Sequence, residues 1–114
     1  MSKEKPFTTG SGNIFLDLGF SEEDAAALTL KSSLFGTLQA ALKSTPGTQT
    51  EIADRLGIPQ PKVSDILKGK MAGFSIERIT NLLLKLDYEI CLDAHPAPPG
   101  CRGRVIDRAD RLAV

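Results

Sequence analysis

Apolar residues between positions 49 and 68 recur with the 3.6-residue period of an α-helix, in two short segments on either side of Gly57. Glycine at the join suits the left-handed backbone that ends many helices, because it has no Cβ. The pattern predicts two short amphipathic helices whose apolar faces meet. The apolar positions are Ile52, Ala53 and Leu56 in the first segment and Val63, Ile66 and Leu67 in the second.

Both segments begin with helix-start signals. Thr48 and Glu51 have the spacing of a capping box, in which two exposed helix-start groups are satisfied reciprocally. Pro59 or Gln60 begins the second helix, and Pro61 lies in its first turn, where a missing N–H costs little. The outward face of the second helix carries amide, hydroxyl and ammonium groups rather than a mixture of Glu and Lys. These details favour a helix-turn-helix over two helices that merely pack together.

Further helices are predicted on both sides of this pair. Ser21 is a good N-cap for a helical pattern at 25–44, since three acidic residues follow it in the first turn. This pattern indicates either one long helix or two helices broken near residues 32–36. Ser75 is expected to cap a later helix that runs through Leu86. The apolar stripe of the first of these segments is Leu30, Leu34, Leu38 and Ala41 or Leu42, with Phe35 beside it.

A strand is predicted for residues 87–94, where apolar and polar side chains alternate. An isolated strand leaves backbone groups unpaired, so this segment needs a partner. One candidate is the same strand of a second subunit, which would make it a dimerisation device. The other is residues 14–18, whose alternation indicates a short strand or an extended segment. In this interpretation residues 1–20 are a flexible leader with that extended segment, 21–94 are the folded domain, and 95–114 are a flexible tail.

Composition and charge are those of an ordinary soluble domain. The chain has 114 residues, enough for one modest core, with 14 basic and 14 acidic side chains. Basic residues are in local excess at 43–70 and again from position 102 onward, a mild signal for nucleic-acid binding. No apolar run approaches the roughly 20 residues of a membrane helix, and the polar start has no apolar signal region. We therefore expect a cytoplasmic protein without a membrane partner.

Groups that could support catalysis or metal binding are sparse. Cys91, His95 and Cys101 lack the fourth clustered ligand that a zinc site needs, so neither a metal nor another cofactor is expected. General acid–base and nucleophilic catalysis require clustered titratable groups, whereas the acidic residues here are spread over helix starts and the predicted strand. We therefore do not expect an enzyme.

Four short runs in and around the predicted helix pair resemble the Xre/Cro family of helix-turn-helix regulators. The family pattern is Thr-Gln-x-Glu-aliphatic-Ala, a Leu-Gly-aliphatic corner, and an aliphatic-Ser pair on the recognition helix. The resemblance implies a mainly α, five-helix, lambda-repressor-like domain that is closed here by the C-terminal strand. The runs are Gln49-Thr50-Glu51-Ile52-Ala53, Leu56-Gly57-Ile58, Pro61-Lys62-Val63-Ser64 and Leu67-Lys68-Gly69-Lys70.

The runs at 12–15, 17–20 and 73–75, together with the closing strand, are similar to the HigA-type antitoxin branch of that family. This resemblance implies the antitoxin and autorepressor of a type II toxin–antitoxin operon, partnered by a HigB/RelE-type ribonuclease toxin. The alternative is a phage-type or orphan Xre-family repressor without a toxin. In an antitoxin, the tail or the apolar residues Ile14, Phe15, Leu18 and Phe20 would contact the toxin.

A homodimer on a palindromic operator is expected, because one helix-turn-helix buries too little surface to be specific alone. The second helix would enter the major groove of double-stranded DNA. Gln60 can pair with adenine, and Lys62 can donate to guanine or to a phosphate. Ser64 suits a phosphate or a base, while Asp65 either accepts from cytosine or is an exposed charge that repels phosphate. The other candidate DNA-binding residues are Pro61 and the phosphate candidates Thr48, Gln49, Lys68 and Lys70.

Overall fold

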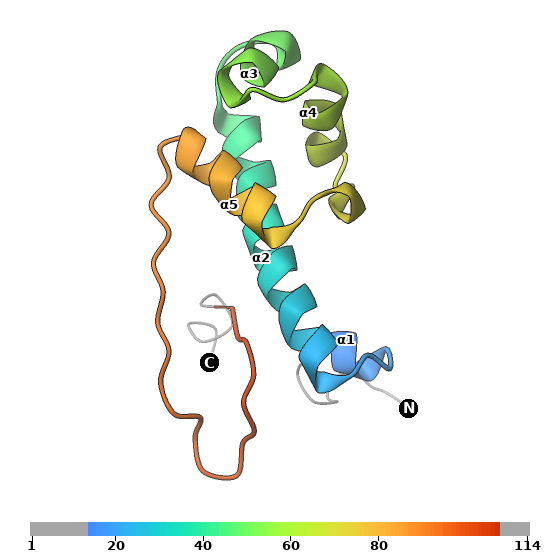
Figure 1. The fold of residues 1–114 in the computed structure, drawn as a ribbon, viewed down its shortest axis with the longest axis vertical. Coiled ribbons are helices and arrows are strands. Elements are labelled where there is room, and N and C mark those ends of the chain that lie inside the picture. Colours follow the sequence, from blue (N-terminus) through green and yellow to red (C-terminus); the bar gives the residue numbers. More distant parts are fainter. Residues whose placement is uncertain (1–13, 108–114) are drawn as a thin grey trace. The chain divides into compact units, whose positions relative to one another are not determined.

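The computed structural model describes residues 14–107 of the chain, and this part is helical (Figure 1). It contains five α-helices and one short 3₁₀ helix, η1. The mainly α, five-helix prediction is therefore confirmed for the described residues. The leader predicted at 1–12 and the last seven residues of the predicted tail lie outside them. The elements are α1 (Ile14–Asp17), α2 (Glu22–Ser44), α3 (Gln49–Leu56), α4 (Gln60–Leu67), η1 (Met71–Gly73) and α5 (Ile76–Lys85).

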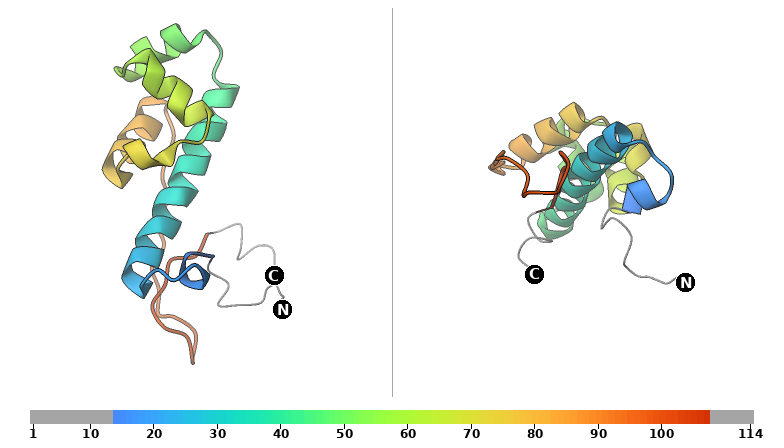
Figure 2. Two further views of the ribbon diagram at one scale, coloured as in Figure 1. Left: turned by 90° about the vertical axis from the view of Figure 1, so that its right-hand side faces the viewer. Right: turned by 90° about the horizontal axis from the view of Figure 1, so that it is seen from below.

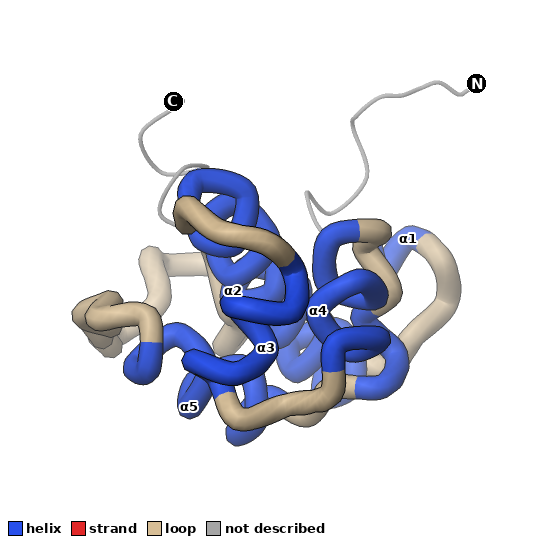
Figure 3. The backbone as a smooth tube through the Cα atoms, turned by 90° about the horizontal axis from the view of Figure 1, so that it is seen from above, coloured by secondary structure: helices blue, strands red, loops and turns tan. Residues whose placement is uncertain are grey.

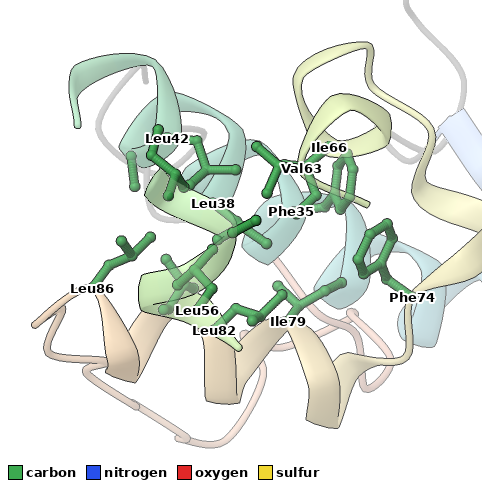
Figure 4. Packing of buried hydrophobic residues seen from close by; sticks show 14 residues of the cluster. Phe35, Leu38, Leu42, Leu56, Val63, Ile66, Phe74, Ile79, Leu82 and Leu86 are labelled. Atoms are coloured by element: carbon green, nitrogen blue, oxygen red, sulfur yellow. The ribbon is translucent and has the colours of Figure 1, made fainter. Parts of the chain in front are cut away.

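The chain divides into two units, residues 31–94 and the segments on either side of them. In the first unit, α3, α4 and α5 are grouped beside the C-terminal half of α2 (Figures 1 and 2). Their apolar faces form one core, in which the rings of Phe35 and Phe74 lie 5.7 Å apart (Figure 4). Leu56, Val63, Ile66 and Ile79 have no exposed surface. The remaining buried members are Leu38, Ala41, Leu42, Ile52, Ala53, Leu82, Leu83 and Leu86.

The helix starts agree with the signals in the sequence. The Asp24 N–H donates to Ser21 Oγ at 3.1 Å, which caps α2, and α2 continues as one unbroken helix to Ser44. Ser75 caps α5 in the same way, since its hydroxyl accepts from the Arg78 N–H. The predicted stripe on α2 is wrong at one position, because the Leu30 side chain is exposed rather than in the core.

The unit formed by the flanking segments contains α1, the start of α2 and residues 95–107. The Phe15 and Phe20 rings meet edge to face, with centroids 6.2 Å apart. Residues 95–107 contain no helix or strand, and Arg102 makes an ion pair with Glu22 at 3.3 Å. Ala25 is buried in this unit, whereas Ile14 and Leu18 each expose about two thirds of their surface.

The predicted C-terminal strand is wrong for the structure described. Residues 87–94 have no strand conformation, and Figure 3 shows only helices and loops in the described part of the chain. The alternating apolar side chains have no covering layer, since Leu92 is 89% exposed and Tyr88 40%. The intramolecular partner is lost as well, because residues 14–17 form α1 and Ile14 O accepts from the Leu18 N–H. Alternation without a neighbouring strand is insufficient to specify a sheet.

Candidate nucleic-acid interface

The corner between α3 and α4 has the geometry of a helix-turn-helix. The Thr48 hydroxyl accepts from the Glu51 N–H at 3.1 Å, and the Glu51 carboxylate accepts from the Thr48 N–H at 2.8 Å. These two hydrogen bonds complete the predicted capping box and hold the pKa of Glu51 below its usual value, the bond from the Thr48 backbone being the larger cause. Gly57 ends α3 with φ of 71°, and the Ile58 N–H returns to Ala53 O.

Helices α3 and α4 are each fastened at their C-terminal end by a side chain from another helix. Lys85, on α5, donates from Nζ to Leu56 O at 2.9 Å. Gln39, on α2, donates from Nε2 to Leu67 O at 3.1 Å. Both acceptors are among the last carbonyl groups of a helix, which have no partner within it. Sequence reasoning missed both residues, because neither lies near its acceptor in the chain and only the fold brings them together.

The first residue of α4 is joined to the first residue of α3. Gln60 is exposed, and its Nε2 donates to Gln49 Oε1 at 2.8 Å. Each carboxamide has two N–H donors and one carbonyl acceptor, so this bond uses one donor of Gln60 and part of the acceptor capacity of Gln49. Gln60 keeps a second N–H and its carbonyl oxygen for a ligand. Gln49 keeps both of its N–H groups.

Lys62 does not extend into solvent beside Gln60. Its side chain is half-buried, and Nζ lies 5.3 Å from the centroid of the Phe74 ring. A Cβ on Gly73 would come within 3.2 Å of that Nζ, so the ammonium occupies a notch between the ring and the glycine backbone. The sequence shows a lysine and a Gly-Phe pair eleven residues later but gives no sign that they meet.

The other predicted site residues surround this face of α4. Pro61 is exposed, whereas Ser64 and Asp65 are half-buried. Lys68 and Lys70 are exposed on either side of Gly69, which turns the chain with φ of 81°. The Thr48 hydroxyl already accepts the α3 capping bond, so only its O–H donor is left for another group.

No group of three His, Cys, Asp or Glu residues that could hold a metal ion occurs among residues 14–107. Within the same range, none of the helices combines the length and the apolar character needed to cross a membrane. The titratable side chains described therefore offer no assembled metal centre.

Comparisons with known proteins agree with the geometry of the α3–α4 corner. Residues 14–95 match a family described as a helix-turn-helix domain. A solved structure described as an XRE family transcriptional regulator is 34% identical, with a TM-score of 0.65, over 74% of this chain and 96% of that one. The comparison with curated proteins found no match. The chain therefore belongs to the Xre-type helix-turn-helix family of DNA-binding transcriptional regulators.

Proposed function

We propose that this regulator recognises a specific operator by inserting α4 into the major groove, with the hydrogen-bonded pair Gln49–Gln60 at the leading end. The major groove accommodates an α-helix and presents a distinct donor and acceptor pattern for each base pair. Helix-turn-helix proteins place the N-terminal residues of the second helix against the base edges. Gln60 is exposed at that position. This pair is the observation that supports sequence readout most directly.

The pair supports readout because it fixes the orientation of the Gln60 carboxamide. With one N–H committed to Gln49, the remaining N–H and the carbonyl oxygen of Gln60 lie side by side on the carboxamide. Adenine offers the complementary groups, an N7 acceptor and an N6 donor, in the major groove. The free N–H groups of Gln49 suit a backbone phosphate near the start of α3.

The test compares Gln60→Ala and Gln49→Ala with the wild type on a DNA duplex selected from a random-sequence pool. Gln60→Ala should lose about 1–3 kcal/mol of discrimination at one A·T base pair of each half-site. Gln49→Ala should weaken the same discrimination less, because Gln60 remains but is no longer oriented. Asn81→Ala removes an exposed carboxamide from α5 and serves as the matched control. Unchanged base preference in Gln60→Ala would reject this reading face.

The active species in this proposal is a homodimer on a palindromic operator. Two copies place two α4 helices in successive major grooves, and half-site spacing then reflects the dimer. Apolar side chains near the end of α5 offer a surface for this contact, since Leu84 is 52% exposed and is followed by exposed Tyr88 and Leu92. Leu84→Glu should shift the mass measured by sedimentation equilibrium from dimer to monomer. A monomeric wild type at the concentration that binds DNA would reject this part.

A second role, as the antitoxin of a HigB/RelE-type ribonuclease, is favoured by the flanking unit. Ile14, Leu18 and Phe20 expose large apolar surfaces that the helix-turn-helix does not use. Exposed acidic residues follow in the first turn of α2, so this region repels DNA and suits a basic protein partner. A phage-type or orphan repressor would need no such surface. The acidic residues are Glu22, Glu23 and Asp24.

Co-expression with the product of the adjacent reading frame tests the antitoxin role. Leu18→Asp should abolish co-purification with a small basic ribonuclease and leave operator binding intact. Leu92→Asp changes an exposed apolar residue of the other unit and controls for a general effect of the new charge on solubility. The absence of such a reading frame would favour the orphan repressor.

A further inference from the structure

The notch that holds the Lys62 ammonium has no function in base recognition as described so far. We propose that it is a preset phosphate-binding position beside the recognition helix. Lys62 would contact the DNA backbone rather than a base, and Phe74 and Gly73 would act as positioning residues. This inference rests on the proposed insertion of α4 into the major groove, and it divides the residues of α4 into a base reader and a phosphate contact.

The location of the ammonium supports a lateral rather than a leading role. Gln60, at the first position of α4, is exposed, whereas the Lys62 side chain folds back to Phe74, beyond the end of the same helix. Phe74 is 2% exposed and belongs to the core, so the ring is a fixed support. A cation within about 6 Å of a ring centroid is attracted to the ring face. The ammonium is thus drawn away from the leading end of α4.

The ammonium retains its hydrogen-bonding capacity in this position. An ammonium has three N–H donors, and an aromatic face satisfies none of them as an oxygen would. Among residues 14–107, no carboxylate forms an ion pair with Lys62, including Asp65 one turn further along α4. Lysine binds phosphate as a point charge, which requires position but not the planar geometry of a base edge.

The neighbouring segment is also basic. Lys68 and Lys70 are exposed in the loop that leads into η1, and η1 ends at Gly73 beneath the ammonium. The loop is turned at Gly69, and the Lys70 N–H is fixed to Asp65 O at 2.9 Å. Lys62 and this loop therefore belong to one locally positive surface, which suits the polyanionic backbone more than a single base pair.

Gly73 explains how the position is kept open. Any side chain there would enter the space of the Lys62 Nζ, and a β-branched one would fill the notch. Gly73 has no left-handed backbone, so the requirement for glycine is one of space. Gly36 provides a matched control, because a Cβ added to that exposed helical residue meets no other atom within 4 Å.

The experiment measures the affinity of Lys62→Ala for two duplexes, one selected from a random pool and one unrelated, as a function of salt. Loss of one phosphate contact per bound protomer should lower the log–log slope by about 0.9, and hence the affinity about fivefold at about 0.15 M salt. The same loss is expected on both duplexes. Lys62→Arg keeps the charge and should keep the slope. An unchanged slope, or a changed preference at one base pair, would overturn the proposal.

The positioning residues are tested by Gly73→Val beside Gly36→Val, with circular dichroism to verify the fold. Gly73→Val should reproduce the reduced slope of Lys62→Ala, while Gly36→Val should match the wild type. A wild-type slope in folded Gly73→Val would refute the role of the notch. If Gly73→Val does not fold, Gly73→Ala replaces it, because one methyl displaces only the flexible end of Lys62; a smaller loss, equal on both duplexes, is then expected. If the wild type shows no preference between duplexes, the proposed function fails, and the slopes still decide the role of Lys62.

Discussion

Replacing Lys85 by methionine tests whether the turn between α3 and α4 is held from α5. The change keeps most of the apolar stem of the side chain and removes the ammonium that donates to Leu56 O at 2.9 Å. A hydrogen bond to a charged group contributes about 1.5–3 kcal/mol to stability when well shielded. Favourable charge at a helix C-terminus adds about 0.3–1 kcal/mol. Because Lys85 is exposed, water replaces part of the lost bond, and we expect a loss of about 1 kcal/mol.

Thermal unfolding followed by circular dichroism at 222 nm measures this loss. For a domain of this size, about 1 kcal/mol lowers Tm by about 4–8 °C. Lys31→Met removes a lysine from the middle of α2 and should change Tm little, since surface substitutions usually stay within about 0.5 kcal/mol. If Lys85→Met unfolds at the wild-type temperature, or Lys31→Met loses as much, the hydrogen bond to Leu56 O does not stabilise the turn.

Three further predictions concern helix ends. Gly57→Ala should destabilise the protein by about 1–2 kcal/mol in urea unfolding, because φ of 71° is unfavourable for a residue with a Cβ; Gly36→Ala, inside α2, should instead stabilise it by up to about 1 kcal/mol. Asp87→Gly should raise Tm, because φ of 65° costs aspartate more than the exposed ion pair to α3 returns; a lower Tm would show that the ion pair dominates. Since the pKa of Glu51 is lowered in the folded state, its contribution is present above the unfolded value of 4.5 and lost as pH falls through the folded value. The Tm difference between wild type and Glu51→Gln should therefore shrink below about pH 4.5, and a constant difference would contradict the capping role.

Local signals in the sequence were sufficient for the helix boundaries of the central motif. Thr48 with Glu51, Gly57, and Ser75 each act on groups within a few residues, so their partners are fixed by the chain itself. The strand at 87–94 shows the opposite case. Its alternation is a true feature of the sequence, but a strand exists only when another segment offers its backbone, and residues 14–17 use theirs within α1.

The site was predictable as a set of residues but not as an arrangement. Gln60 and Lys62 were both expected to face DNA, and spacing gave no reason to treat them differently. The structure separates them, because Gln60 bonds to Gln49 across the corner while Lys62 lies against Phe74. Such side-chain partners depend on tertiary placement, as do the bonds from Gln39 and Lys85 to helix ends. None of these pairs leaves a periodic trace in the sequence.

The bond between Gln49 and Gln60 constrains how operator preference can change. A substitution at either residue alters two things together, the group presented to the base and the support that orients it. The effects of changes at these positions should therefore be non-additive, since residues in contact couple while distant ones do not. Most single substitutions at Gln60 would abandon one operator without acquiring another. New specificities are then reached through paired changes, and libraries that vary both positions simultaneously should yield altered-specificity variants that single-site libraries lack.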